Sequence, residues 1–348
     1  MKAIKVGIIG CGVIGPTHIE SYQRVPGVEV AWACDLKLKR AQAAAEKYGI
    51  PCYTTDADAV FASDVDAVSI CTDHASHCDL VLAALKAGKD VLCEKALANS
   101  PENLRRMVAA AKKYKDERIF SGVFQHRFDP INRAVRDLLA SGALGTLLSA
   151  NLQICCRRTN EYYKADPWRG TWAKEGGSIL INQAIHYLDQ LQWQMGGVKE
   201  VTGFFSNLTH RGVIQTEDTA TAAVRFKNGA LGTISATCSS HMNWDTSLRY
   251  YGSEGTIEIA NDKPARVLCR DEKLAKKILA RLQACENAPQ QATGKSYYGT
   301  GHVAQIADFV NAVRTRRAPF VPAVEAADPV RLLFAIYKAQ RSGLSVRV

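Results

Sequence analysis

Long apolar runs are missing from this chain of 348 residues. No stretch approaches the roughly 20 apolar residues that a membrane-spanning helix needs. The first residues pass straight into a strand pattern, without the architecture of a signal peptide. Internal repeats and low-complexity tracts are lacking as well. These absences predict a cytoplasmic protein with no membrane partner.

Cysteine pairs are also lacking. The chain has 11 cysteines, an odd number, and no Cys-x-x-Cys motif occurs among them. Cys34, Cys71 and Cys93 each end an apolar run, where a cysteine acts as a small buried hydrophobe. Cys155 and Cys156 are neighbours on an expected strand and would point to opposite faces. The pattern favours free thiols in a reducing compartment over disulfides, and it predicts no metal site.

A nucleic-acid-binding motif is absent although the chain is basic. The formal net charge is +10, and much of the excess lies after Asp262. A cationic surface can steer an anionic ligand, or it can be a solvated surface without a partner. Because no motif accompanies the charge, we expect no nucleic-acid partner.

The chain is longer than one hydrophobic core allows, since cores stop growing at roughly 250–300 residues. The first third alternates strand and helix patterns, which predicts a doubly wound parallel sheet with helices on both faces. We expect this α/β part, residues 1–124, to be an NAD-binding Rossmann domain. Its strand patterns are Lys5–Ile9, Val28–Cys34, Ala67–Cys71, Asp90–Cys93 and Ile119–Phe124. Its helical patterns lie near residues 17–24, 38–48, 76–87 and 101–115.

After Phe124 the pattern changes to consecutive strands. An Asn-Gly pair at 228–229 indicates a hairpin between two of them. We expect residues 125–348 to form an α+β domain with a large, mostly antiparallel open sheet for substrate binding and oligomerisation. Its strand patterns are residues 147–156, 201–206, 219–226, 231–238, 248–252 and 256–259. Its helical patterns lie near 130–141, 178–195, 302–315 and 329–342.

Residues 262–300 are less regular. Leu274, Ile278 and Leu282 share one helical face with Cys285, which predicts an amphipathic surface helix with a basic outer face. That outer face is either solvated or a contact for a membrane or a partner. Residues 288–294 read as a loop.

A glycine-rich loop follows the first apolar strand and opens a helix. Its first glycine permits a tight turn, its second lets the backbone approach a pyrophosphate, and its third allows close packing of helix and strand. The helix N-terminus adds N–H groups and a partial positive charge. The loop consists of Gly10, Cys11, Gly12, Val13, Ile14 and Gly15.

An acidic residue stands where the second strand of such a domain ends. Asp35 follows Gly15 by twenty residues. A carboxylate there accepts hydrogen bonds from the adenine-ribose hydroxyls and repels a 2′-phosphate. The cofactor is therefore expected to be NAD. NADP is the less favoured alternative, because Lys37, Lys39 and Arg40 lie close enough to hold a phosphate.

Further motifs make the chain recognisable. Thr72 and His77 follow the fourth strand pattern, Glu94-Lys95 follows the fifth, and a glycine-rich segment at 176–189 reads GGSILINQAIHYLD. The chain resembles the glucose–fructose oxidoreductase / inositol dehydrogenase / rhizopine catabolism family over nearly its whole length. The resemblance implies that Thr72, His77, Glu94 and Lys95 line the cofactor site, and that the enzyme acts on a CH–OH group.

Two positions depart from the family pattern. The usual Glu-Lys-Pro signature is Glu94-Lys95-Ala96 here, and this change concerns the shape of the loop. Polyol dehydrogenases of the family carry aspartate four residues before the histidine, whereas this chain has Asn182. In this it is similar to the branch that includes UDP-N-acetyl-2-amino-2-deoxyglucuronate dehydrogenase.

The proposed chemistry falls on residues of the same motifs. On one helix, Asn182 and His186 at i and i+4 project from one face, with Asp189 a further three residues on. Oxidation of a secondary alcohol needs a base, and histidine, with an ordinary pKa of about 6.5, is suited to that role. We expect His186 to be the base, Asn182 to position the substrate and Lys95 to stabilise the developing alkoxide or share the proton. Asp189 either orients the imidazole or belongs to a buried network.

The segment 157–172 lies between the motifs of the two domains and is rich in arginine and aromatic residues. Aromatic rings can face a sugar, and arginines can bind carboxylate or phosphate groups. Ordinary loop packing is the alternative. We expect substrate contacts from Arg158, Tyr163 and Arg169.

The sequence thus predicts an NAD-dependent oxidoreductase for a ring hydroxyl of a sugar, glycoside or nucleotide sugar. A reductase running the reverse reaction stays open. So do an NAD-dependent glycosidase and a non-catalytic, dinucleotide-sensing regulator of sugar metabolism. The expected open sheet predicts a homodimer or homotetramer.

Overall fold

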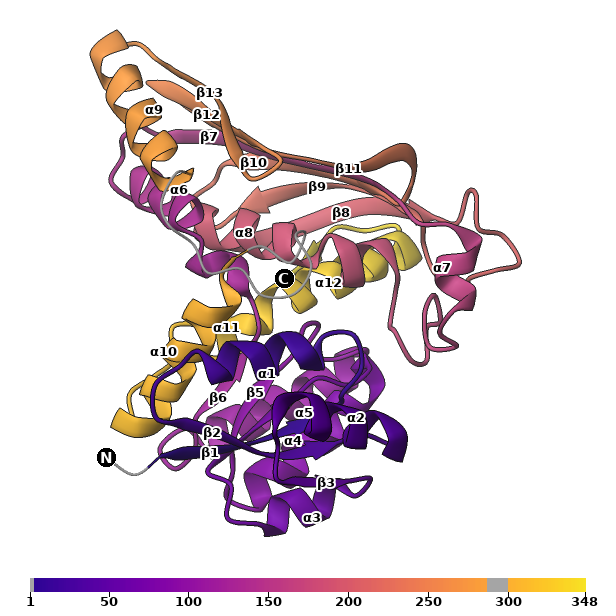
Figure 1. Ribbon diagram of the computed structural model, residues 1–348. Helices are drawn as coiled ribbons and strands as arrows, with labels where there is room; N and C mark the ends of the chain where they lie inside the picture. The colour runs from indigo at the N-terminus through magenta and orange to yellow at the C-terminus, as the bar shows by residue number, and fades with distance from the viewer. Residues whose placement is uncertain (1–2, 287–299) are drawn as a thin grey trace. The chain divides into compact units, whose positions relative to one another are not determined.

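The computed structural model describes residues 3–286 and 300–348. Within these ranges the chain forms two compact units, residues 3–128 with 300–327 and residues 129–286 with 328–348. Each unit is built on its own β-sheet (Figure 1). The loop expected at 288–294 lies outside the described residues.

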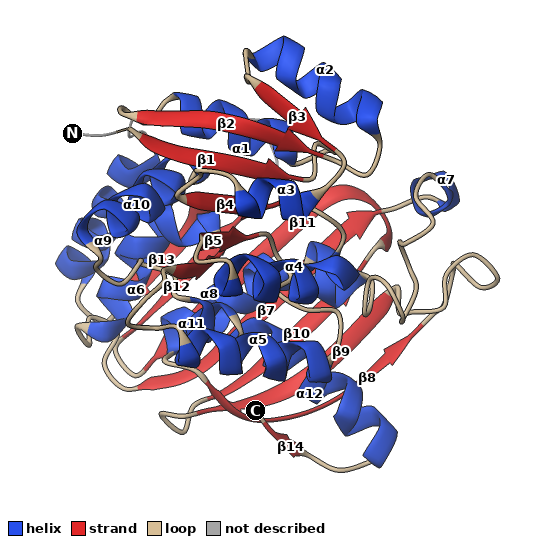
Figure 2. Ribbon diagram, turned by 90° about the horizontal axis from the view of Figure 1, so that it is seen from below, coloured by secondary structure: helices blue, strands red, loops and turns tan. Residues whose placement is uncertain are grey.

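A six-stranded parallel sheet forms the centre of the first unit (Figure 2). The strand order β3-β2-β1-β4-β5-β6 reverses beside β1, and in such sheets ligands bind at the carboxyl ends of the strands at this reversal. The expected doubly wound α/β fold is confirmed. The strands are β1 (Ile4–Ile9), β2 (Val28–Cys34), β3 (Cys52–Thr54), β4 (Ala67–Ile70), β5 (Asp90–Cys93) and β6 (Phe120–Gly122).

Helices α3, α4 and α5 of the first unit begin where a side chain accepts from free backbone N–H groups. Asp73 accepts from Ala75 and Ser76 at the start of α4, and Ser100 accepts from Asn103 at the start of α5. The helices are α1 (Gly15–Gln23), α2 (Leu38–Tyr48), α3 (Ala57–Ala62), α4 (His74–Lys86), α5 (Pro101–Lys113), η1 (Gln125–Phe128), α10 (His302–Thr315) and α11 (Ala323–Ala326).

Helix α10 is far along the sequence but belongs to the first core. Its residues Ile306, Phe309 and Val310 pack in one cluster with residues of β1 and α1. Gln305 accepts from the backbone N–H of Phe124 at 3.1 Å and donates to the carbonyl of Gly122 at 2.8 Å. The contacts therefore divide the chain differently from the boundary expected after Phe124. An apolar helical stripe shows that a helix packs on a core, but not on which core.

An eight-stranded sheet forms the second unit, in the order β13-β12-β11-β7-β10-β9-β8-β14. Among the described strands of this sheet, only β7 and β10 pair in parallel, so the sheet is mostly antiparallel, as expected. The strands are β7 (Leu147–Arg157), β8 (Val198–Ser206), β9 (Thr219–Phe226), β10 (Leu231–Thr237), β11 (Ser239–Gly252), β12 (Gly255–Ala260), β13 (Lys263–Cys269) and β14 (Val346–Arg347).

The Asn-Gly signal does mark a hairpin. Strands β9 and β10 pair on either side of it, and the Phe226 N–H donates to the Ala230 carbonyl at 2.8 Å. Gly229 has a φ of 92°, a left-handed conformation that glycine adopts readily.

Helices cover one face of this second sheet. Helices α8 and α12 lie along it below the strands in Figure 1, and no described helix lies on the opposite face. Strands β9 and β10 accordingly alternate buried and exposed residues. The amphipathic helix α9 buries Ile278 and Leu282, as expected. The helices are α6 (Pro130–Ala140), α7 (Asn160–Lys164), a π-helical turn η2 (Ile179–Gln183), α8 (Ile185–Met195), α9 (Glu272–Glu286) and α12 (Asp328–Ser342).

Candidate active site

The glycine loop forms a cradle at the carboxyl end of β1. Gly10 has a φ of 99°, and a Cβ atom there would lie 2.6 Å from the Cys71 carbonyl oxygen. A Cβ atom on Gly15 would lie 2.3 Å from the Gly10 carbonyl oxygen. These two glycines are therefore required by the backbone itself. Beside Gly12 a Cβ atom would meet nothing nearer than Arg40 Nη1 at 4.0 Å, so this side of the loop is open.

The residues around this open side fit a dinucleotide. Val13 is 60% exposed, and Ile14 is the N-cap of α1, whose first turn offers N–H groups to an anion. Asp35 directly follows β2 and accepts from the Cys11 N–H at 3.0 Å and the Lys37 N–H at 2.9 Å. Its carboxylate is thus held beside the loop, where a ribose hydroxyl would reach it.

Two of the expected cofactor residues support the site from within the protein. His77 is fully buried, and its ring nitrogens contact the carbonyl oxygens of Ala96 at 2.9 Å and Thr72 at 3.2 Å. Burial lowers the pKa of His77 despite these contacts. The imidazole therefore connects the loops after β4 and β5, and the expected contact of His77 with the cofactor stays a prediction. Thr72 itself is partly exposed.

Glu94 is likewise buried, and its carboxylate contacts both α1 and the backbone of the loop after β5. Its Oε1 contacts His18 Nε2 at 2.9 Å, and its Oε2 accepts from the Lys95 N–H at 3.0 Å. Burial opposes ionisation, but the hydrogen bond and charge of His18, with the charges of His302 and Lys95, lower the pKa of Glu94 to about 2. Since His18 lies on α1, the pair joins the glycine-loop helix to the lysine loop.

Lys95 stands out in its surroundings. From Asp90 to Asn99 every residue is buried except Lys95, which is partly exposed. The peptide bond between Lys95 and Ala96 is cis. Lys95 is thus the one residue of this segment whose side chain is accessible. It lies at the carboxyl end of β5, and the glycine loop lies at the same edge of the sheet.

We predict that Glu94→Gln changes the acid stability of the protein. The pKa of Glu94 lies below its ordinary value of 4.5 in the folded state. Its ionisation therefore stabilises the fold above about pH 4.5, and this contribution is lost as the pH falls toward about 2. We expect the variant to be about 1–3 kcal/mol less stable at neutral pH, with a shallower loss of stability in acid.

Urea unfolding at a series of pH values measures this difference. Glu29→Gln, at an exposed position of β2, is the matched control and should follow the parent protein. Parallel curves for Glu94→Gln and the parent would show that the buried carboxylate does not contribute in this way.

The expected catalytic helix of the second unit is interrupted. Asn182 lies in the π-helical turn, where the Ala184 N–H donates to the Ile179 carbonyl at 2.8 Å, and α8 begins only at Ile185. The sequence analysis expected Asn182 and His186 to lie one turn apart on a regular α-helix. The structure instead places Asn182 in the π-helical turn and His186 in α8. Such π-helical turns are rare, and many occur at functional sites.

The same segment exposes two side chains only. From Glu175 to Gln190 every residue is buried except Asn182 and His186, which are partly exposed. Asp189 is 1% exposed and so lies inside the unit. Because the other residues of this segment are buried, the side chains that it presents at the surface are the Asn182 amide and the His186 imidazole.

The three residues expected to contact substrate have different environments. Tyr163 is 4% exposed, and its hydroxyl contacts Ser178 Oγ at 2.6 Å and Cys238 Sγ at 3.1 Å. Tyr163 thus packs inside the second unit, and its expected contact with the substrate stays a prediction. Its neighbour Tyr162 is partly exposed.

The two arginines gather around Tyr162 instead. Arg158 donates to Gln183 Oε1 at 2.6 Å and lies 5.2 Å from the Tyr162 ring centre. Arg169 lies 4.1 Å from the same ring and pairs with Asp166 at 2.8 Å. The structure thus joins Arg158 to the π-helical turn through Gln183, a contact that the sequence analysis missed.

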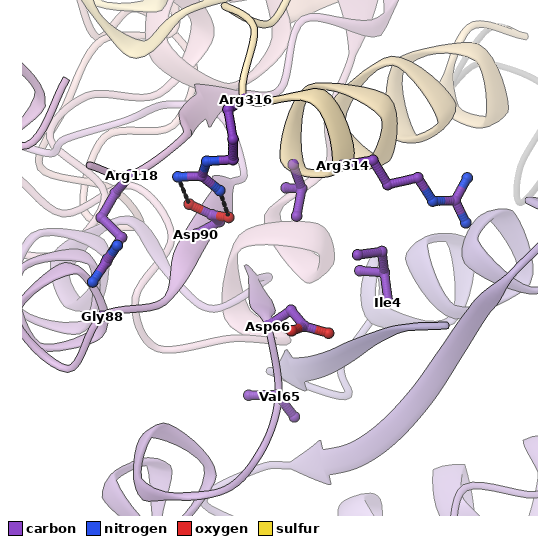
Figure 3. Close-up of a pocket in the computed structure, with 9 residues that line it drawn as sticks. Ile4, Val65, Asp66, Gly88, Asp90, Arg118, Arg314 and Arg316 are labelled. Carbon is purple, nitrogen blue, oxygen red and sulfur yellow. Dashed lines mark hydrogen bonds and ion pairs between the residues drawn. The ribbon is translucent and has the colours of Figure 1, made fainter. Parts of the chain in front are cut away.

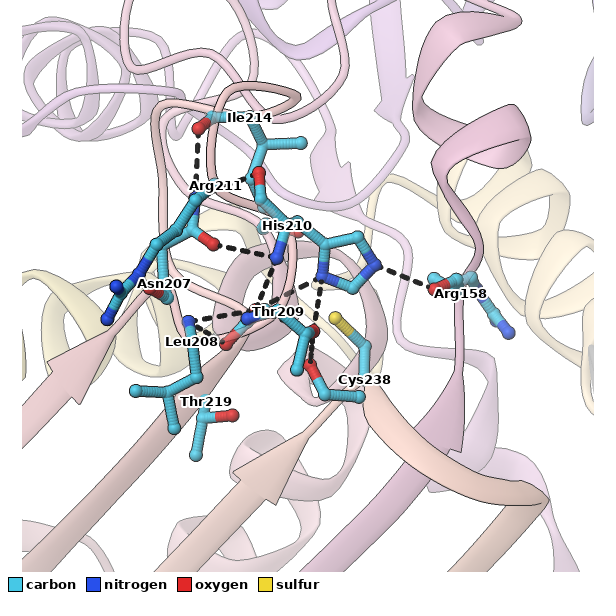
Figure 4. A network of polar contacts seen from close by, with 12 residues as sticks. Arg158, Asn207, Leu208, Thr209, His210, Arg211, Ile214, Thr219 and Cys238 are labelled. Atoms are coloured by element: carbon cyan, nitrogen blue, oxygen red, sulfur yellow. Dashed lines mark hydrogen bonds and ion pairs between the residues drawn. The ribbon is translucent and has the colours of Figure 1, made fainter.

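A buried acid fixes the backbone at Arg158. Asp218 accepts from the N–H groups of Leu208 and Thr209 and contacts His210 Nδ1 at 3.1 Å. His210 Nε2 contacts the Arg158 carbonyl oxygen at 2.8 Å (Figure 4). Burial opposes ionisation, but the N–H donors hold the pKa of Asp218 below its usual range. The sequence analysis missed this network, although an acidic pair at 217–218 directly precedes the expected strand at 219–226.

A cavity of about 470 Å³ lies elsewhere in the first unit (Figure 3). Its wall includes Ile4 and Asp90, the first residues of β1 and β5, so it opens at the amino edge of the sheet, opposite the glycine loop. Arg316 binds both oxygens of Asp90, at 2.6 and 3.2 Å. The cavity is therefore separate from the candidate cofactor site.

The described residues contain no group of three or more His, Cys, Asp or Glu side chains placed to hold a metal ion. All 11 cysteines are free thiols. Among the described helices, none has the length and apolar character needed to cross a membrane.

Comparisons with known proteins match both units. Residues 4–121 match the model of an oxidoreductase family with an NAD-binding Rossmann fold, and residues 132–258 match the GFO/IDH/MocA C-terminal domain. Myo-inositol 2-dehydrogenase from Thermotoga maritima is 30% identical over 273 residues, which cover 77% of this chain and 79% of that protein. D-glucoside 3-dehydrogenase from Escherichia coli is 33% identical over 56% of this chain and 54% of its own length.

Solved structures show the same fold. The WlbA dehydrogenase from Bordetella pertussis, in complex with NADH and UDP-GlcNAcA, superposes with a TM-score of 0.89 at 27% identity. The superposition covers 100% of this chain and 98% of that one.

Proposed function

The chain belongs to the GFO/IDH/MocA family of NAD-binding oxidoreductases, and from this premise we propose that it oxidises a ring hydroxyl of a sugar, glycoside or nucleotide sugar. The membership confirms the family resemblance, the NAD cofactor and the activity on CH–OH groups that the sequence analysis expected. The ring hydroxyl, the substrate class and the roles of individual residues form the proposal.

One observation carries the proposal. In the buried segment from Glu175 to Gln190, the side chains that reach the surface are those of Asn182 and His186. A polar side chain that is buried without a hydrogen bond destabilises the fold, so polar groups at a surface are common. Here the two polar groups stand on one turn of fixed backbone, which is the arrangement that positions an alcohol for reaction. A hydroxyl needs one group to orient it and one to accept its proton.

We assign the base role to His186. A neutral imidazole accepts the hydroxyl proton, and an asparagine amide can only form hydrogen bonds. Asn182 therefore orients the substrate, and the Lys95 ammonium stabilises the negative charge that develops on the oxygen. When bound, NAD supplies the hydride acceptor. Gly10, Gly12, Val13, Ile14, Gly15, Asp35 and Thr72 would hold it.

The same region supports an anionic sugar derivative as substrate. Arg158 donates to Gln183, one residue from Asn182, and it can bind a carboxylate or phosphate in a bidentate manner. The net charge of +10 favours the approach of such a ligand. The structure with UDP-GlcNAcA named above belongs to a protein of the same fold. We therefore place nucleotide sugars and sugar acids first among candidate substrates.

The open sheet face supports the proposal of a homodimer or homotetramer. Phe204 is 77% exposed there, and Leu231 is 54% exposed. Strands β8 and β10, which carry them, lie on either side of β9. We propose that the second unit binds the substrate and joins the subunits through this face.

The proposed function is tested by turnover. Mass spectrometry of the purified protein first identifies retained NAD(H) and any co-purified sugar. A panel of free sugars, glycosides, sugar acids and UDP-sugars then follows, with NADH absorbance as the readout. We expect NAD reduction with at least one sugar. Glycoside cleavage without net NADH would favour the glycosidase, and NAD-dependent ligand binding without turnover would favour the regulator.

A further inference from the structure

Two buried glutamates flank the π-helical turn of the second unit. Glu175 is 1% exposed and Glu217 is fully buried. A buried carboxylate is costly unless it accepts hydrogen bonds from well-placed donors. The partners of these two acids therefore show what each of them holds in place.

Glu175 holds the side chain of Asn182. Its Oε1 accepts from Asn182 Nδ2 at 2.5 Å, and its Oε2 accepts from the backbone N–H of Gly170. Both oxygens of the carboxylate are thus used as acceptors. Because Asn182 Nδ2 donates to Glu175 Oε1, the orientation of the Asn182 amide is fixed.

Glu217 holds the backbone of the same turn. Its Oε1 accepts from the N–H groups of Ser178 and Leu180, both at 3.1 Å, and from the Tyr337 hydroxyl at 2.7 Å. Its Oε2 is buried and has no hydrogen-bond partner among the described residues. Glu217 therefore acts through a single oxygen.

The turn packs closely on these anchors. A Cβ atom on Gly177 would lie 2.2 Å from the Tyr337 hydroxyl oxygen, so the chain can approach Tyr337 only with glycine there. Burial raises the pKa of Glu217, and the hydrogen bonds that it accepts only partly offset this. A neutral group at position 217 is thus compatible with the site.

We propose that Glu175 and Glu217 are positioning residues of the active site. Glu175 sets the side-chain amide of Asn182, and Glu217 sets the backbone of the turn that carries it. This inference rests on the proposed function, because it assumes that Asn182 orients the substrate.

The same substitution, glutamate to glutamine, is expected to lower activity at position 175 but not at position 217. In Glu175→Gln an amide NH₂ replaces one accepting oxygen and faces a donor, so one hydrogen bond is lost. We expect kcat/KM for the sugar to fall about 10- to 100-fold, the loss of one charge-assisted hydrogen bond. Glu217→Gln keeps the oxygen that accepts, and we expect it to stay within a few-fold of the parent protein. Glu217→Ala should lose activity as Glu175→Gln does.

A double-mutant cycle separates positioning from general damage. If Glu175 acts through Asn182, Glu175→Gln should have little further effect in an Asn182→Ala background. The affinity for NAD should stay unchanged in all variants, since the glycine loop lies in the other unit. Glu272→Gln, at an exposed position of α9, is the matched control. Additive effects in the cycle, or equal losses for Glu175→Gln and Glu217→Gln, would overturn the proposal.

A second readout does not depend on turnover. In protein labelled with ¹⁵N-asparagine, the side-chain NH₂ signal of Asn182 is identified by its absence from Asn182→Ala. We expect Glu175→Gln to shift this signal and Glu272→Gln to leave it in place. If the parent protein turns over no sugar while the signal behaves as expected, the proposed function fails and the positioning role of Glu175 stands. An unmoved signal in Glu175→Gln contradicts that role directly.

Discussion

The His186→Ala variant is expected to lose about 10²- to 10⁴-fold in kcat for sugar oxidation, the usual contribution of a general base. Affinity for NAD should persist, because the glycine loop and Asp35 lie in the other unit. Folding should persist as well, since His186 is partly exposed. Steady-state kinetics over a range of pH check the expectation.

The shape of the pH profile identifies the base. In the parent protein, kcat/KM should fall on the acidic side as the base becomes protonated. That limb should vanish in His186→Ala and remain in variants of other residues. His241→Ala, at an exposed position of β11, is the matched histidine control and should behave like the parent. Unchanged turnover in His186→Ala would remove this residue from the mechanism.

Lys95→Met should lower kcat by about 10²- to 10³-fold, the range seen when a group that stabilises a developing oxyanion is removed. Methionine keeps the length and flexibility of the side chain but not its charge. Lys95→Arg should restore only part of the activity, because a planar guanidinium does not replace a compact ammonium group. Lys86→Met, on the exposed side of α4, is the control.

The Lys95 variants also test the division of roles. We expect the acidic limb of the pH profile to survive in Lys95→Met, since the proton is assigned to His186. If the limb disappears in Lys95→Met and survives in His186→Ala, then Lys95 is the base and His186 the supporting group. Wild-type rates in Lys95→Met would exclude both roles for the lysine.

Much of the first unit could be predicted from its sequence, because local patterns determine it. The strands β1, β2, β4 and β5 are apolar runs, and Gly10 and Gly15 stand where the backbone leaves no room for a Cβ atom. The strand β3, with three residues, is too short to show a period. In the second unit, the sequence pattern gave no indication of β13, because exposed residues interrupt the apolar pattern of this strand.

The candidate site could be predicted in its residues but not in its supports. His186, Asn182 and Lys95 follow from motifs. The π-helical turn depends on Glu217, which is distant in sequence and accepts from Ser178 and Leu180. Tyr163 faces the core because Ser178 and Cys238 contact its hydroxyl, and no local pattern encodes that contact.

The placement of α10 bears on how this protein can be dissected. A fragment that ends at Phe124 would lack Ile306, Phe309 and Val310, each of which stabilises the first core by about 1.5–3 kcal/mol when buried. It would also lack Gln305, which bonds the backbone of Phe124 and Gly122. An isolated cofactor-binding fragment would therefore have to be spliced from two stretches of the gene. On the ribosome, the first core stays incomplete until residues of α10 have been made.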